Sequence, residues 1–306
     1  MRVSSEMKSK IFFIVLFALF AVLSAADYEN LIFTRAYQDS DGKHVAFIRK
    51  ELASAIVRFQ REINSFPDIP IEIHIAPNKQ TYTHWTAGRH IVFDSSLAFV
   101  DLEQTRVYVK HPSQIGSNKK LIQVLLHEYI HIFIHHHWAD APLWFHEGMA
   151  MYFTHEVNFG FLEYVLSNNS IHSRYLLPKH QYTYPEHKAE IEPYYFQSAL
   201  VVRKLVELHR EQFIRLFAFA EEEIDFETSF LLAMGKSVDS FLLDSEKALK
   251  DIYKLNVYKA IIMLSWLSFP IILIIAKIKK NHKTKKLLEQ WEIEEQIEEQ
   301  NESIGE

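Results

Sequence analysis

One stretch of the chain is apolar on nearly every side of the helix that it predicts. Residues 121–134 read Leu-Ile-Gln-Val-Leu-Leu-His-Glu-Tyr-Ile-His-Ile-Phe-Ile, and a helix that is apolar all round is a buried one. It nevertheless carries His127, Glu128 and His131. Buried polar side chains are costly without partners, and an unpaired carboxylate is costlier still, so these three need a partner that neutralises them together. A metal ion meets that need.

Upstream of this stretch, the hydrophobic pattern predicts one amphipathic helix and a small sheet. Residues 43–65 place apolar side chains at helical spacing. Strands are predicted at residues 30–37 and at a short apolar run, 90–93, as well as at two segments in which apolar and polar residues alternate, 69–76 and 105–110.

Downstream, the pattern predicts helices only. They cover residues 143–164, 195–208, 211–219, 226–234 and 237–254. Between the first two, Pro178, Pro185 and Pro193 favour a loop. The predicted fold class is therefore α+β, with a small N-terminal mixed sheet and helices, a metal-site helix and an all-helical C-terminal lobe.

The N-terminal end has the pattern of a secretory signal. Residues 11–23 are uninterrupted apolar, basic residues precede them, and Ser24-Ala25-Ala26 offers small residues for cleavage before Asp27. We expect a signal peptide at residues 1–26. An uncleaved signal anchor is the alternative, and in either case the chain that follows is exported.

A second apolar run near the C-terminus predicts a membrane-spanning helix. Residues 260–276 form a run of 17 without a charge, at the short end of what a span requires, and we place the span at 258–277. A buried core helix is the alternative. A block of six lysines follows at residues 277–286, which places residues 278–306 in the cytosol. The end of this tail has eight Glu and no basic residue, so it is either a solvated helix or disordered.

Residues 27–254 are thus expected to form the exported domain, with a sheet-containing lobe (27–137) and a helical lobe (138–254). The chain has no cysteine, so neither a disulfide framework nor a lipoprotein anchor holds this domain. The net charge of −6 argues against a nucleic-acid partner, and the only basic cluster lies beside the predicted span, where it can meet anionic lipid. The oligomeric state is open.

The candidate chemistry lies in the spacing of the buried polar residues. His127 and His131 are four residues apart, so both imidazoles leave one helix face and one zinc ion can bind between them. Glu128 lies beside them and can take a proton from a metal-bound water, as in the H-E-x-x-H motif. Pro142 can begin a second helix that supplies Glu147 as the third ligand. The alternative is a buried helix whose histidines bond to backbone carbonyls.

Two segments resemble the peptidase MA-like branch of the gluzincin zinc metallopeptidases. They are His127-Glu-Tyr-Ile-His131 and Trp144-x-x-Glu147-Gly148-x-Ala150. Residues 195–198, Tyr-Phe-Gln-Ser, are similar to the family's Y-x-Q-S segment, and the resemblance covers roughly residues 28–250.

The resemblance implies a zincin-like fold and one Zn2+ bound by His127, His131 and Glu147. It implies that Glu128 is the general base, that Tyr195 donates a hydrogen bond to the oxyanion, and that an edge strand, for which 105–110 is the candidate, pairs with substrate. Many members also carry an acidic residue four positions after the third ligand, where it orients a zinc histidine. This chain has Met151 there, so that support has to come from elsewhere.

Two other histidines compete for the role of third ligand. His137 follows His127 at the spacing of a metzincin histidine, but Ile134 occupies the position where that motif needs glycine for a sharp turn. His146 adjoins Glu147 but points about 100° away round the helix. Glu147 is therefore the predicted ligand, and a packed or surface role is favoured for His146.

These observations predict a membrane-anchored, zinc-dependent metallopeptidase that hydrolyses a peptide or protein substrate at the periplasmic or outer side of a cell membrane. The alternative is an exported peptide- or protein-binding module on an inactive zincin fold. The sequence does not determine the substrate or the choice between endo- and exopeptidase.

Overall fold

The computed structural model describes residues 30–33, 43–87, 96–157 and 175–304. The predicted signal peptide and the strand predicted at residues 90–93 lie outside these ranges. The chain divides into two compact units, Met1–Ser245 and Glu246–Glu306.

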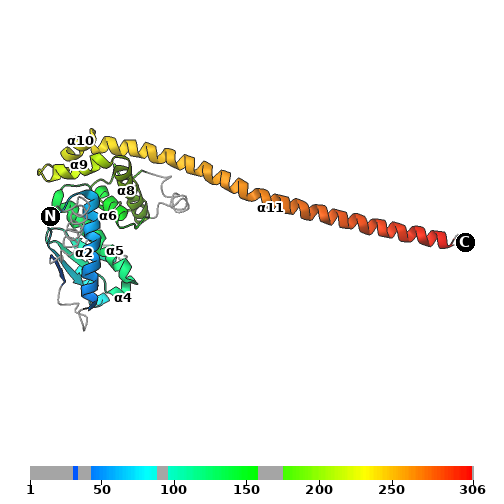
Figure 1. The fold of residues 1–306 in the computed structure, drawn as a ribbon, viewed down its shortest axis with the longest axis horizontal. Helices are drawn as coiled ribbons and strands as arrows, with labels where there is room; N and C mark the ends of the chain where they lie inside the picture. Colours follow the sequence, from blue (N-terminus) through cyan, green and yellow to red (C-terminus); the bar gives the residue numbers. More distant parts are fainter. Residues whose placement is uncertain (1–29, 34–42, 88–95, 158–174, 305–306) are drawn as a thin grey trace, which may run out of the picture. The chain divides into compact units, whose positions relative to one another are not determined.

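The first unit is a mixed α/β structure with a small sheet (Figure 1). In chain order its elements are β1 (Leu31–Phe33), α2 (Lys43–Ile63), β2 (Ile71–Ile75), α3 (Lys79–Thr86), β3 (Ala98–Asp101), β4 (Arg106–Val109), α4 (Pro112–Ile115), α5 (Asn118–His137), α6 (Leu143–Phe153), α8 (Lys188–Leu208), α9 (Arg210–Ala220) and α10 (Phe226–Met234). Helix α11 (Val238–Ile304) begins in this unit. The predicted sheet-then-helices order is confirmed, whereas α3 and β3 were not predicted.

The sheet has four strands in the order β1-β2-β4-β3. Strands β1, β2 and β4 are parallel, and β3 runs antiparallel to β4. The candidate for the edge strand, residues 105–110, is therefore wrong: β4 is bonded on both sides, and β3 is the edge strand on that side of the described sheet. The reason is topological, because β3 precedes β4 in the chain but lies outside it in the sheet.

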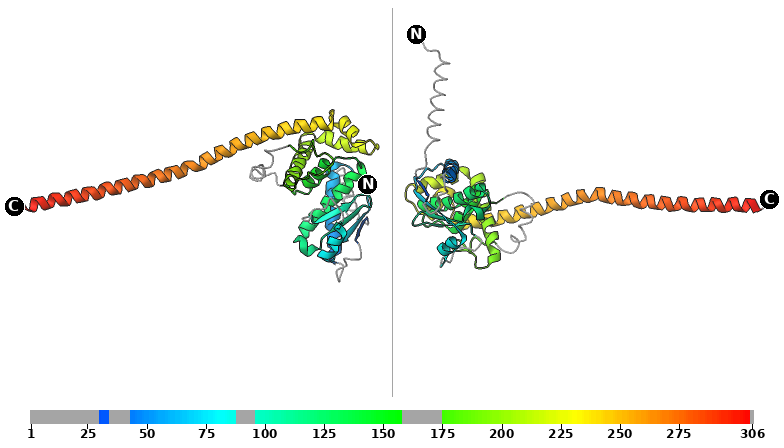
Figure 2. Two further views of the ribbon diagram at one scale, coloured as in Figure 1. Left: turned by 180° about the vertical axis from the view of Figure 1, so that it is seen from behind. Right: turned by 90° about the horizontal axis from the view of Figure 1, so that it is seen from below.

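One face of the sheet contributes to the core. Ile71, Ile73 and Ile75 of β2 are almost fully buried, while the alternating Glu72 and His74 are only half-buried. Helix α2 contacts β1, helix α5 contacts β3 and β4, and the two helices contact each other; Figure 2 adds two further views of this layer. The buried helix predicted at residues 121–134 is confirmed within α5, where Leu125, Ile130 and Phe133 are among the buried side chains.

Helix α8 begins earlier than the sequence predicts. The helix was expected from residue 195, but α8 begins at Lys188 and contains Pro193. The loop predicted as far as Pro193 is therefore wrong at its end. Pro193 lies inside the helix, where the amide hydrogen that proline lacks would otherwise bond to the carbonyl oxygen of Ala189.

Helices α6 and α8 pack closely at Gly148. A Cβ atom at this position would lie within 2.6 Å of Val202 Cγ2 and closer still to the carbonyl oxygen of Ser198. Contacts this short require the backbone of α8 to move. The glycine after Glu147 therefore permits the two helices to approach each other.

We expect Gly148→Ala to lower the stability of the protein by about 1–3 kcal/mol, the usual cost of overpacking. In an unobstructed helix the same change stabilises by roughly 1 kcal/mol, so the sign of the effect identifies its cause. Thermal unfolding of the detergent-solubilised protein, followed by circular dichroism, measures it. An increased melting temperature would contradict the close packing.

In the second unit, α11 is one helix through Ile304. Its segment Ile261–Ile293 is long and apolar enough to cross a membrane. Large apolar side chains such as Ile262, Trp266 and Phe269 are exposed there, which suits a lipid surrounding better than water. Of the two states expected for the tail, the helical one is observed as far as Ile304.

Candidate metal centre

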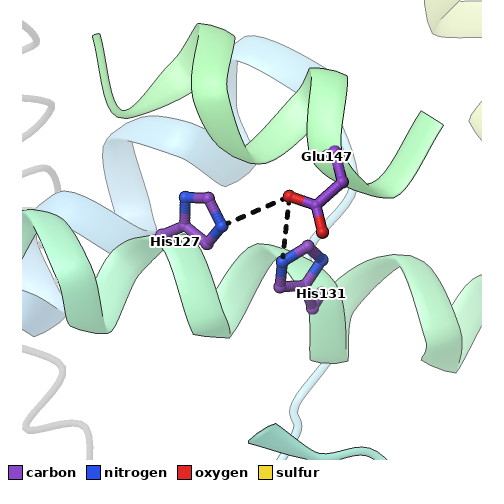
Figure 3. Close-up of side chains that lie close together, drawn as sticks. All are labelled: His127, His131 and Glu147. Carbon is purple, nitrogen blue, oxygen red and sulfur yellow. Dashed lines mark ion pairs between the residues drawn. The ribbon is translucent and has the colours of Figure 1, made fainter. Parts of the chain in front are cut away.

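Three side chains from two adjacent helices converge in the first unit. His127 and His131 project from α5, and Glu147 projects from α6 towards both of them (Figure 3). The side chain of Ser117 caps α5 by accepting a hydrogen bond from the main-chain nitrogen of Lys120. Pro142 occupies the cap position of α6, as predicted. The two helices contact each other, and this contact brings the three residues together.

The distances within this trio fit a metal ion. Nε2 of His127 lies 3.7 Å from Oε2 of Glu147, and Nε2 of His131 lies 3.9 Å from the same oxygen. One ligand atom from each of the three residues lies within 4.8 Å of the others. Tetrahedral zinc with bonds near 2.0–2.1 Å places neighbouring ligand atoms about 3.4 Å apart. The trio can therefore hold a metal ion, and its nitrogen and oxygen donors suit zinc and several other divalent metals.

Glu156 fixes the orientation of His127. The carboxylate oxygen Oε1 accepts a hydrogen bond from Nδ1 of His127 at 2.9 Å. The same oxygen accepts a hydrogen bond from Oγ1 of Thr154 at 3.0 Å, and Nζ of Lys120 lies 3.7 Å from the other oxygen. Because Nδ1 donates to Glu156, Nε2 is the nitrogen left for a metal. Glu156 thus supplies a carboxylate that orients His127, in place of the acidic residue that is absent at position 151, where the chain has Met151.

Tyr184 holds Glu147 through the oxygen that does not face the two histidines. The hydroxyl of Tyr184 donates a hydrogen bond to Oε1 of Glu147, while Oε2 faces the two histidines. The sequence did not identify either Tyr184 or Glu156. Tyr184 lies in the proline-containing connection before α8, and Glu156 lies beyond the end of α6, so neither shares a helical period with the residue that it contacts.

Burial and charge set the protonation states of the trio. Burial alone would lower the pKa of His127, but hydrogen bonds to Glu147 and Glu156 outweigh it and raise the pKa well above 6.5. Burial, together with the charge of His127, lowers the pKa of His131 to about 4 despite the opposing charge of Glu147. Burial raises the pKa of Glu147, but the two histidines and Tyr184 outweigh it and lower the pKa to about 2. Glu147 is therefore ionised and His131 neutral at pH 7, as metal ligands must be, whereas the raised pKa of His127 favours its protonated form, which has to release a proton when a metal binds.

Glu128 is buried on the same helix as the two histidines, and its pKa is raised where that of Glu147 is lowered. Burial raises its pKa to about 7, and the charges of Glu147 and Glu156 add to that effect, although His127 opposes it. Among the residues that the structure describes, none forms a hydrogen bond or ion pair with its carboxylate. A carboxylate with a pKa near neutrality can both accept and release a proton at physiological pH.

The two competing histidines lie outside the trio. Nε2 of His137 is 2.9 Å from Oγ of Ser65, and Nδ1 is 2.8 Å from the carbonyl oxygen of Phe133, so both ring nitrogens already have partners. His146 is buried, with its ring centroid 5.7 Å from that of His131. Burial and the charge of His131 lower the pKa of His146 to about 3. His146 therefore packs beside the site as a neutral side chain.

Tyr194 and Tyr195 are adjacent in the chain, and their hydroxyls have different partners. The hydroxyl of Tyr194 donates to the carbonyl oxygen of His180 at 3.0 Å and is buried. The rings of both tyrosines pack against that of Tyr184, and the Tyr195 ring is perpendicular to it with centroids 6.2 Å apart. Burial and the charge of Glu147 raise the pKa of Tyr195, although a hydrogen bond with Tyr184 opposes them. Tyr195 is therefore a neutral phenol close to Tyr184.

We expect Glu156→Ala to weaken metal binding by about 10–100-fold, the usual cost of removing such a support. Glu156→Gln keeps an oxygen that can accept the hydrogen bond from Nδ1 and should lose less. Competition with a chromophoric chelator measures the dissociation constant. Glu186→Gln, at an exposed position, is the control, and equal affinities for all variants would contradict the role of Glu156.

No protein-family model matches the chain, and no curated protein matches it.

Proposed function

We propose that this chain is a membrane-anchored zinc metallopeptidase of the peptidase MA-like gluzincin type. The observation that carries the proposal is the trio of half-buried His127 and His131 with buried Glu147, together with the buried Glu128 on the same helix as the two histidines. The two segments that resemble the family contain all four of these residues, and the resemblance supplies zinc as the ion. A bound zinc ion supplies a Lewis acid for peptide hydrolysis.

The residues of the chain have separate tasks in this proposal. His127, His131 and Glu147 hold the ion, and Glu156 and Tyr184 hold two of these ligands in place. Glu128 removes a proton from the attacking water and delivers it to the leaving amine. Tyr195 donates a hydrogen bond to the carbonyl oxygen on which negative charge develops.

The alternative function is peptide or protein binding without cleavage. The absence of an acidic residue at the position of Met151 supports this alternative. The hydrogen bond between Glu156 and His127 removes that support, because an oriented histidine does not depend on that position. Catalysis is therefore favoured over binding alone.

Hydrolysis is tested with the full chain in detergent micelles, loaded with one equivalent of zinc. The protein is incubated with a mixed peptide library, and the products are identified by mass spectrometry. We expect new peptide termini that disappear after removal of zinc by a chelator and return on reloading. Intact peptides that co-purify with the protein would instead support the binding module.

We further propose that the first unit faces the periplasm or cell exterior and that residues 278–306 face the cytosol. The lysine block after the predicted span supports this orientation. Protease added to intact spheroplasts should degrade the first unit and spare an epitope tag at the C-terminus. Protection of the first unit would refute the orientation.

A further inference from the structure

The two oxygens of Glu147 have different surroundings. Oε2 lies 3.7 Å from Nε2 of His127 and 3.9 Å from Nε2 of His131. Oε1 accepts the hydrogen bond from the hydroxyl of Tyr184. One oxygen of the carboxylate thus faces the two histidines, and the other is bonded to Tyr184.

This division matters because a carboxylate can bind a metal through one oxygen or through both. A catalytic zinc site consists of three protein ligands and one position kept open for water or substrate. A carboxylate that binds through both oxygens adds a fourth protein donor atom, so a metal that also keeps its water becomes five-coordinate and has less room for substrate. Something must hold the second oxygen away.

We propose that Tyr184 is a positioning residue that restricts Glu147 to coordination through Oε2 and so keeps one position at the metal open. The inference rests on the proposed metal site, and it assigns Tyr184 a role distinct from that of the ligands and of Glu128. The phenol is suited to this task because its hydroxyl donates to Oε1, the oxygen that does not face the two histidines.

The position of Tyr184 supports the same role. Tyr184 is half-buried, and its ring packs against the rings of both Tyr194 and Tyr195 at the start of α8. The ring of Tyr184 is therefore held in place by two side chains of α8 as well as by its own segment. Tyr182, two residues earlier, is exposed, and its hydroxyl lies 3.5 Å from Glu227 instead.

The test uses cobalt(II) as the probe, because its visible absorption weakens when its coordination number rises above four. The full chain, Tyr184→Phe and the control Tyr182→Phe are freed of metal, loaded with one equivalent of cobalt and compared. We expect Tyr184→Phe to bind cobalt with a weaker visible band. In the zinc-loaded enzymes we expect kcat to fall by about 10–100-fold with little change in KM. Tyr182→Phe should match the unmodified chain in both measurements.

The outcomes separate the inference from the proposed function. A visible band for Tyr184→Phe that equals that of the unmodified chain overturns the inference alone. If the unmodified chain binds cobalt but cleaves no peptide, the peptidase proposal fails while the spectra still decide the role of Tyr184. An unmodified chain without a cobalt band overturns both. Phenylalanine retains the ring packing, and Tyr184→Met, which also lacks the hydroxyl, repeats the measurement and must give the same weakened band.

Discussion

Replacement of Glu128 by glutamine is expected to abolish peptide hydrolysis while the metal stays bound. Glutamine has nearly the same size and shape, but its amide cannot accept a proton from water. General acid–base residues typically contribute 10²–10⁴-fold to the rate, so kcat should fall by about that factor. The fold should survive, because no hydrogen bond or ion pair involving this carboxylate is present among the described residues.

The measurement pairs kcat on a peptide substrate with metal content determined by mass spectrometry of the purified protein. Glu103→Gln is the matched control, since Glu103 is exposed. Undiminished hydrolysis by Glu128→Gln would refute the assignment of the general base. Loss of metal together with activity would show that Glu128 contributes to metal binding instead.

Replacement of Glu147 by alanine is expected to remove the metal under mild chelation. A site with two imidazoles alone binds zinc weakly, because structural and catalytic zinc sites use at least three protein ligands. Oε2 of Glu147 is the oxygen that faces both histidines, at 3.7 Å and 3.9 Å. The change also leaves the hydroxyl of Tyr184 without its acceptor.

His137→Ala and His146→Ala are the controls, and both should retain the metal. His146→Ala is the stricter of the two, because the ring of His146 lies beside that of His131. Metal content is measured after dialysis against a weak chelator at increasing concentrations. Retention of metal by Glu147→Ala with its loss from His137→Ala would move the protein towards the metzincins.

The spacing of residues within single helices determined much of the candidate site. His127 and His131 share a face of α5 because a helix repeats every 3.6 residues. The apolar run around them predicted burial, and α5 is buried along most of its length. The C-terminal helix that is long and apolar enough to cross a membrane was equally readable, since apolar length is a local property.

Contacts between segments that are distant in the chain could not be read in this way. Glu156 lies 29 residues from His127, and Tyr184 lies 37 residues from Glu147. No periodicity links such pairs, because their distance in space depends on how α5, α6 and the connection to α8 turn back on one another. The space required beside Gly148 likewise depends on the approach of α8.

The order of the strands in the sheet could not be predicted from the sequence either. Alternation of apolar and polar residues predicted β2 and β4 as strands, but the order of strands in the sheet is set by chain reversals that alternation does not encode. The candidate edge strand was therefore placed on β4, although β3 occupies that edge. The sequence by itself determined the helix that carries the two histidines, the candidate third ligand and the apolar span. Only the tertiary structure decided which side chains support those ligands, because support at a metal site depends on packing between elements rather than on spacing within one.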